Sequence, residues 1–358
     1  MSQLPTPAEW RTAIAPYREA DKRRSVAQII NTYGPYVASV AAAVAVYPYS
    51  VAAAVAFALL AGAITVRLFI LGHDCGHGSF FKEQWANDVV GWWSSALAFT
   101  PYWQWRHGHM LHHAHSGDSD WDGIGYFWSK TLKQHYESSP GARAFYRFYR
   151  HPLTLLVAGG PWLFLLDYRF PQKGADKRMW RDVIGTNLLW GAAITALTMT
   201  LGGGAAVAIV LPIALVASVC GLWAFYVQHH YESSYWGKGE KWDYTRAALE
   251  GSSFLDLPQP LQYFSGNIGF HHVHHLAPKV PNYRLEEAHE ALPFLKAVKP
   301  ITWRQVWGGV GLSLVDEESG QWVTFAEGER RARAQGLGPF KAADAVRAAA
   351  TAALVKPQ

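Results

Sequence analysis

Four long apolar segments with almost no charge alternate with segments that are crowded with His, Arg, Asp and Trp. A transmembrane helix needs roughly 20 residues, at about 1.5 Å rise per residue, to cross the hydrocarbon layer. The apolar segments meet this length, the first and third with their polar ends in the headgroups. Their limits are Ile29–Tyr47, Val51–Leu71, Val183–Leu201 and Ala205–Val227. Very short turns join them in pairs, so the pattern predicts an all-α integral membrane protein with two helical hairpins.

Two shorter apolar stretches lie between the second and third predicted spans, at Val89–Phe99 and Leu153–Leu166. Both are shorter than a usual span, and we therefore expect interfacial or re-entrant helices. The alternative is that they form a further hairpin.

Charge predicts how the chain is oriented. Arg11, Arg18 and residues 22–24 precede the first span, the 72–182 connection is rich in Lys and Arg, and the two tight turns carry no charge. The positive-inside rule then places both termini and the long connections in the cytoplasm, and we expect a multi-pass protein of a bacterial inner membrane. The net charge of +5 is too small to indicate nucleic-acid binding.

The chain is accordingly divided into three parts. Residues 1–28 form a cytoplasmic segment without a cleavable signal peptide, residues 29–295 a membrane domain, and residues 296–358 a cytoplasmic tail with a helix at about Lys341–Leu354. Only two cysteines occur, far apart in sequence, which favours neither a disulfide framework nor a thiolate metal site.

Histidine is the residue with the strongest pattern. Of the 16 histidines, all but His135, His151 and His289 fall into four short clusters, each close to a predicted membrane face in the cytoplasm. The clusters are His73-Asp74-Cys75-Gly76-His77, His107 to His115, His229-His230, and His271-His272-Val273-His274-His275. The three isolated histidines are expected at the surface.

Helical spacing selects nine of these histidines. Residues at i, i+3 and i+4 share one face of a helix. With one more histidine at the end of the fourth span, this spacing selects His73, His77, His109, His112, His113, His229, His271, His274 and His275. The remaining members, His107, His115, His230 and His272, lie off these faces and are expected as neighbours that support the ligands.

Nine neutral imidazoles suit two transition-metal ions, whereas tetrahedral zinc would use four. An adventitious His-rich metal binder is the alternative. However, burying so many imidazoles without a metal would leave many polar nitrogens unsatisfied. The pattern therefore predicts a buried site for two metal ions.

At these residues the sequence resembles the membrane fatty acid desaturases, specifically the bacterial and plastid-like acyl-lipid omega (Δ12-type) branch. The similarity lies in the His73–His77 box, in Trp105-Arg106-His107-Gly108-His109 with His112-His113, in Gln228-His229, and in Gly266–Phe270 with the last cluster and Pro278–Tyr283. It covers roughly residues 30–295. It implies four spans with a cytoplasmic helical cap that holds a His-ligated diiron centre, and O2-dependent insertion of a cis double bond into an acyl chain.

Several residues near the boxes have open roles. Asp74 is a candidate for supporting a ligand, and Asn267 either binds a metal-bound water or, more simply, caps a helix. Asp118, Asp120 and Asp122 either orient ligand imidazoles or form a solvated acidic loop. Cys75 is expected to point away from the face that carries His73 and His77.

No fused electron carrier is visible in the sequence, because it lacks a cysteine set for an iron–sulfur cluster and a dinucleotide fingerprint. We therefore expect a separate donor such as ferredoxin with its reductase. The nearest alternative function is a hydroxylase or acetylenase on the same scaffold. A membrane metal-binding or transport protein is disfavoured, since it would need polar groups at mid-membrane depth. Whether the acyl group is carried by a lipid, CoA or acyl carrier protein stays open, with the resemblance favouring a membrane lipid.

Overall fold

The structure is a computed structural model that describes residues 4–121 and 127–340. Four of its described helices are long and apolar enough to cross a membrane, namely α2 (Lys22–Val46), α3 (Val51–His77), α9 (Lys177–Leu201) and α10 (Gly203–His229). Side chains of Asp21, Ser50 and Asp176 accept hydrogen bonds from the first backbone N–H groups of α2, α3 and α9. The two predicted hairpins are therefore confirmed.

The long helices extend beyond the predicted spans. α9 begins at Lys177 rather than Val183, while α3 continues from Leu71 to His77 and α10 from Val227 to His229. The predicted limits marked only the apolar part, but polar residues continue the helix without interruption. This extension mounts histidines directly on two membrane helices.

The two shorter apolar stretches form helices that do not reach spanning length. The first lies in α4 (Gln84–Leu97), and the second comprises a π-helical turn at Leu153–Ala158 followed by α8 (Gly159–Leu165). Neither is among the four described helices suited to cross a membrane, which agrees with the interfacial or re-entrant interpretation rather than a further hairpin.

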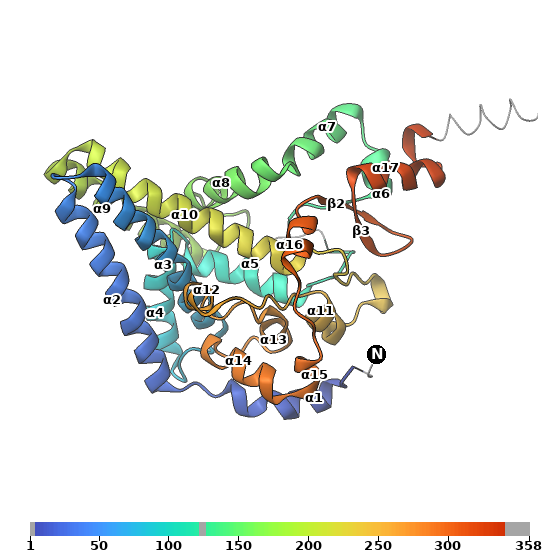
Figure 1. Ribbon diagram of the computed structural model, residues 1–358, viewed down its shortest axis with the longest axis horizontal. Coiled ribbons are helices and arrows are strands. Elements are labelled where there is room, and N and C mark those ends of the chain that lie inside the picture. The colour runs from blue at the N-terminus through green and yellow to red at the C-terminus, as the bar shows by residue number, and fades with distance from the viewer. Residues whose placement is uncertain (1–3, 122–126, 341–358) are drawn as a thin grey trace, which may run out of the picture.

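α3 and α10 form the centre of the membrane region, with α2 packed on α3 and α9 packed on α10 (Figure 1). A Cβ placed on Gly62 of α3 would lie 2.8 Å from the Cβ of Val216 on α10. Glycine at this position is therefore required for the close approach of the two helices. The large apolar side chains of Leu188 and Met199 on α9 and of Val207 on α10 are exposed.

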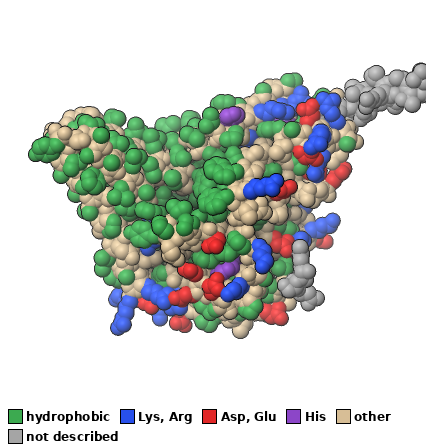
Figure 2. All heavy atoms as spheres, viewed as in Figure 1, with side chains coloured by type: hydrophobic (Ala, Val, Ile, Leu, Met, Phe, Trp, Pro, Cys, Tyr) green, Lys and Arg blue, Asp and Glu red, His purple; other side chains and the backbone are tan. Residues whose placement is uncertain are grey.

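Figure 2 shows a broad, nearly uncharged apolar surface over the long helices, with charged side chains gathered along the lower edge and on the right-hand side. Contiguous apolar patches on soluble monomers rarely exceed a few hundred Å². A bilayer provides the apolar surroundings that this surface needs, so the protein is an integral membrane protein.

The remaining elements form a cap over one end of the long helices (Figure 1). Its helices are α1 (Pro7–Ile14), α4, α5 (Tyr102–Ala114), α6 (Leu132–Tyr136), α7 (Pro140–Tyr149), α8, α11 (Tyr244–Glu250), α12 (Gln259–Ser265), α13 (His271–Leu276), α14 (Asn282–Ala291), α15 (Pro293–Lys296), α16 (Trp303–Gly309) and α17 (Phe325–Ala334). The fold is thus mostly helical, as predicted.

One small sheet adds to the helical pattern. β2 (Leu312–Asp316) pairs in parallel with β1 (Lys130–Thr131) and antiparallel with β3 (Gln321–Thr324). Strand β2 is buried throughout, so this part of the 296–358 segment folds back onto the cap. The predicted helix at Lys341–Leu354 lies outside the described residues.

Candidate metal centre

The first histidine box lies on the last two turns of α3. His73 and His77 stand four residues apart and are both buried. The helix ends at Gly78, whose positive φ of 65° suits a glycine at a helix C-terminus. Cys75 faces an apolar cluster with Leu71 and Phe80 and belongs to neither histidine group, as expected.

Three further elements deliver the other histidines. α5 carries His109, His112 and His113, α10 ends at His229, and the six-residue helix α13 carries the last three. The structure brings all nine histidines selected by helical spacing into two compact groups. The first consists of His73, His77, His109, His113 and His274, and the second of His112, His229, His271 and His275.

Within each group, one ring nitrogen per histidine lies within 4.8 Å of all the others. In the first group, the Nε2 atom of His274 is 3.0 Å from that of His73 and 2.9 Å from that of His113. In the second, the Nε2 atom of His229 is 3.1 Å from that of His112 and 3.0 Å from that of His271. The nitrogens therefore point at shared centres.

These separations fit metal ligation. With a metal–nitrogen bond of about 2.1 Å, two ligands at right angles are about 3.0 Å apart. The Nε2 atom of His77 is buried and has no hydrogen-bond partner among the described residues, as expected of a nitrogen directed at a metal. Five nitrogens in the first group also exceed the four of a tetrahedral zinc site. The donor set fits two ions for which imidazole is suited, including iron.

Electrostatics favour the neutral form that ligation requires. Burial, followed by repulsion from neighbouring histidines, holds the pKa of His109 and His113 on α5 well below the ordinary value. The same two causes, in the same order, lower the pKa of His274 and His275 on α13. Neutral imidazoles bind metal ions without first releasing a proton.

A buried polar chain supports His73. The Nδ1 atom of His73 lies 3.1 Å from Oδ1 of Asp74, whose Oδ2 accepts hydrogen bonds of 2.6 Å from the backbone N–H and 2.8 Å from the side-chain amide of Asn282. Asn282 in turn exchanges two amide hydrogen bonds with Gln28 of α2. Asp74 therefore contacts His73 and Asn282 through its two carboxylate oxygens.

Neither Gln28 nor the role of Asn282 followed from the sequence. Asn282 lies in the segment that carried the family resemblance, which was the available signal. Gln28 is a polar residue on the inner face of α2, and this position among apolar neighbours was its only sign.

The four histidines expected as neighbours belong to neither group. His107 is exposed, while His115 lies 3.5 Å from Asp118 and stacks on Trp121 with ring centres 3.8 Å apart. His230 is buried between Tyr226 and Trp322, and His272 contacts His289 with 3.0 Å between ring nitrogens.

The acidic loop and Asn267 make contacts with residues outside the two groups. Asp120 is exposed and accepts a hydrogen bond from the backbone N–H of Gly239. Asp118 contacts His115, which belongs to neither group. Asp122 lies outside the described residues. Asn267 has a positive φ of 59°, follows the C-terminus of α12 and donates a hydrogen bond to the backbone oxygen of Asn282.

Two of the three histidines expected at the surface are buried instead. His135 is fully covered by aromatic rings, including those of Tyr146 and Phe325, and His289 is 3% exposed on the inner face of α14. A single histidine has no periodic partner, so the sequence does not reveal what covers it. Only His151 is exposed as predicted.

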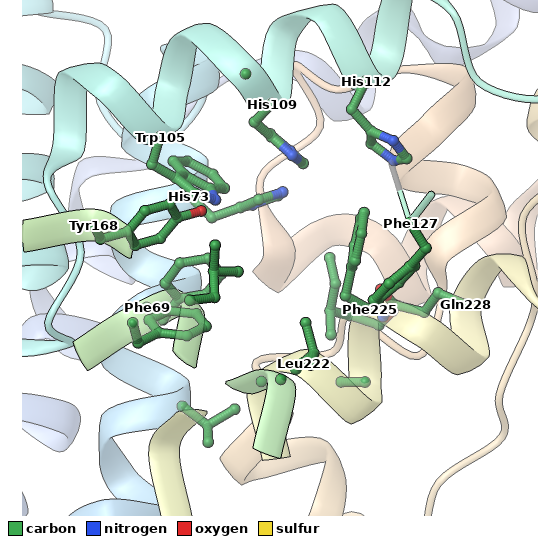
Figure 3. A pocket seen from close by; sticks show the side chains of 18 of the residues that line it. Phe69, His73, Trp105, His109, His112, Phe127, Tyr168, Leu222, Phe225 and Gln228 are labelled. Carbon is green, nitrogen blue, oxygen red and sulfur yellow. The ribbon is translucent and has the colours of Figure 1, made fainter. Parts of the chain in front are cut away.

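A pocket of about 370 Å³ adjoins both groups. Its walls come from α3, α5, α8 and α10 and are mainly apolar, with Phe69, Leu222 and Phe225 among the lining residues. Figure 3 shows His73, His109 and His112 on one side of this pocket and Leu222 on the other. An apolar pocket with a few convergent polar groups is the usual form of a binding site for an apolar molecule.

Comparison with known proteins agrees with this geometry. The family model described as fatty acid desaturase matches residues 50–305. The chain is 38% identical over 312 residues to a fatty acid desaturase of Bacillus subtilis, covering 87% of this chain and 89% of that protein.

Two cyanobacterial proteins are similar over somewhat shorter regions. The sn-1 acyl-lipid omega-3 desaturase (ferredoxin) of a Nostoc species is 29% identical over 78% of this chain and 79% of its own. The sn-1 oleoyl-lipid 12-desaturase of a Synechocystis species is 30% identical over 65% of this chain and 68% of its own. Four membrane helices, two converging histidine groups and these matches lead to one conclusion: the chain belongs to the fatty acid desaturase family.

Proposed function

We propose that the protein introduces a cis double bond into the acyl chain of a membrane lipid, using O2 and two electrons from outside. The observation that carries the proposal is the mainly apolar pocket whose lining includes histidines of both groups. The lipid substrate is supported by the two cyanobacterial relatives, an acyl-lipid omega-3 desaturase and an oleoyl-lipid 12-desaturase.

The nine histidines would hold two iron ions, five nitrogens around one and four around the other. Iron supplies the redox chemistry with O2 that removal of hydrogen from an unactivated methylene requires. Overall, two C–H bonds break and one C=C bond forms, while O2 takes up these two hydrogens, two further protons and two electrons to give two molecules of water. The buried imidazoles stay neutral, so they are available as ligands throughout.

The protein's own part in the reaction is to position the acyl chain and exclude bulk water. Phe69 and Trp105 line the pocket next to His73, and Phe225 lines it next to His112 (Figure 3). Rigid aromatic walls hold an apolar chain against the histidine groups and keep the reacting methylenes apart from solvent.

Electrons would come from a separate ferredoxin with its reductase. The support is the Nostoc relative, which is described as a ferredoxin desaturase. The bacterial inner membrane with the metal centre on the cytoplasmic side is the proposed location, supported by the Lys and Arg content of the segments around the histidines. Turnover with NAD(P)H and no added carrier protein would contradict the donor.

Lipid analysis of a host that expresses the gene tests the function. Gas chromatography with double-bond localisation should show a new cis monoene or diene in the membrane lipids. A hydroxylated acyl chain would instead identify a hydroxylase, and an unchanged lipid profile with zinc as the only bound metal would favour a metal-binding protein.

His274→Ala provides the matching residue test. His274 contacts both His73 and His113, so we expect the variant to insert in membranes but to lose more than 100-fold in activity and part of its iron. His151→Ala, at an exposed histidine, is the control and should keep full activity. Substantial turnover by the His274 variant would remove this residue from the proposed ligands.

A further inference from the structure

Gly221 of α10 lines the pocket and faces open space. A Cβ placed on this residue would have no heavy atom within 4 Å, apart from its chain neighbours and the helix's own backbone. The pocket wall thus has a position where a side chain is missing although there is room for one.

Other glycines nearby are explained by packing. A Cβ on Gly160 of α8 would lie 2.4 Å from the backbone oxygen of Ser218, and one on Gly159 would lie 3.2 Å from Leu222. These two residues let α8 and α10 approach closely enough to close one wall of the pocket. Gly221 has no such neighbour, and its φ is not in the left-handed region that favours glycine.

Glycine inside a helix is destabilising relative to alanine, because it loses more conformational freedom on folding. Gly191 of α9 has equally open space around its Cβ position, but Gly221 also lines the pocket, so the space that Gly221 leaves belongs to the pocket. Eight residues separate it from His229 on the same helix, which corresponds to about 12 Å along the axis. Figure 3 places the adjacent Leu222 on the side of the pocket away from His112.

We propose that Gly221 determines how long an acyl chain the pocket accepts beyond the histidine groups. This inference rests on the proposed function. A larger side chain at position 221 would occupy the space that the distant end of a long chain uses, while a shorter chain would still reach the histidines. A single methylene in a hydrophobic pocket is worth roughly 10- to 200-fold in selectivity.

The test is a graded series of Gly221→Ala, Gly221→Val and Gly221→Leu. Each variant is given a mixture of membrane lipids with acyl chains of fourteen, sixteen and eighteen carbons, and the unsaturated products are quantified by chain length. We expect the ratio of shorter to longer unsaturated products to rise with side-chain size, by about tenfold or more for leucine.

Gly191→Leu is the matched control, because Gly191 is an exposed glycine inside α9 with no atom within 4 Å of a Cβ and lies outside the pocket. It should keep the wild-type ratio. An unchanged ratio across the Gly221 series would overturn the inference, and so would a loss of turnover in Gly221→Ala that affects all chain lengths equally. If the wild-type protein itself makes no unsaturated product, the proposed function fails instead.

Discussion

At the residue scale, the two groups divide the histidines of α5 and of α13, whereas His73 and His77 of α3 stay together in the first group. His109 and His113 join the first group and His112 the second, whereas His271 and His275 join the second group and His274 the first. Successive residues of an α-helix are about 100° apart, so i and i+4 differ by about 40°, whereas i+3 and i+4 differ by about 100°. The spacing therefore predicts which histidines converge, and it explains the division once two centres are known.

The buried side-chain contacts that run from His73 through Asp74 and Asn282 to Gln28 lead to a prediction about Asn282. Asn282→Leu removes the side-chain hydrogen bond to Asp74 and both contacts with Gln28. Groups that orient metal ligands typically contribute 10- to 100-fold in metal affinity. We expect the variant to lose about this factor at the first group and to keep iron at the second, so elemental analysis should approach one iron per chain.

Asn87→Leu is a matched control for this prediction. Asn87 is as deeply buried and exchanges two hydrogen bonds with the backbone of Phe81, but it lies outside both histidine groups. We expect Asn87→Leu to lose about as much folding stability as Asn282→Leu but to retain two irons. Two irons bound with wild-type affinity in Asn282→Leu would show that the polar chain serves only to hold α2 and α14 together.

At the element scale, periodicity and length predicted the long helices and missed the sheet. Spans such as α3 are predicted by a continuous apolar stretch that is long enough to cross a membrane. By contrast, β1 has two residues, and its partner β2 lies about 180 positions later. No local pattern encodes such a pairing. The burial of His135 could not be predicted for the same reason, because Phe325 of α17, which covers it, is far away in the sequence.

The burial of His135 predicts a pH dependence for this part of the cap. Burial, followed by repulsion from Arg147, lowers the pKa of His135 from about 6.5 to about 4. Between these values the unfolded chain binds more protons than the folded one, so stability falls as the pH falls through this range. When the pH is lowered from about 7 to about 5, the free energy of unfolding should fall less in His135→Leu than in wild type. The difference between the two decreases should be on the order of 1 kcal/mol.

The measurement is the unfolding midpoint of purified protein at both pH values, with His151→Leu as the exposed control. Wild type and His135→Leu share all the other buried histidines, so the difference between their changes in stability reports on residue 135. An equal loss of stability in wild type and His135→Leu would contradict the lowered pKa.

At the scale of the whole molecule, the two histidine groups join segments that are far apart in sequence. The first group connects α3, α5 and α13, and the second connects α5, α10 and α13. Two of these helices belong to different membrane hairpins. The hairpins are held by the bilayer and by their own packing, whereas the cap helices between them depend on contacts with one another. Bound metal would therefore link the two hairpins to the cap.

α13 should depend most strongly on this link. Isolated helices shorter than about 12 residues are marginal in water, and α13 has six residues, three of which belong to the two groups. A ligand present at about 1,000 times its Kd stabilises the folded state by about 4 kcal/mol. Removing iron with a chelator should therefore increase hydrogen–deuterium exchange in α13 and α5, by up to about a thousandfold where exchange follows opening of the site.

α9 provides the internal comparison, because it carries no histidine and few of its side chains are buried. Its exchange should be unchanged by the chelator, and adding back iron should restore protection in α13. Equal changes in α9 and α13 would indicate general unfolding rather than loss of a local link. If α13 stays protected without iron, aromatic and apolar packing alone holds the cap, and the nine histidines are arranged before the metal binds.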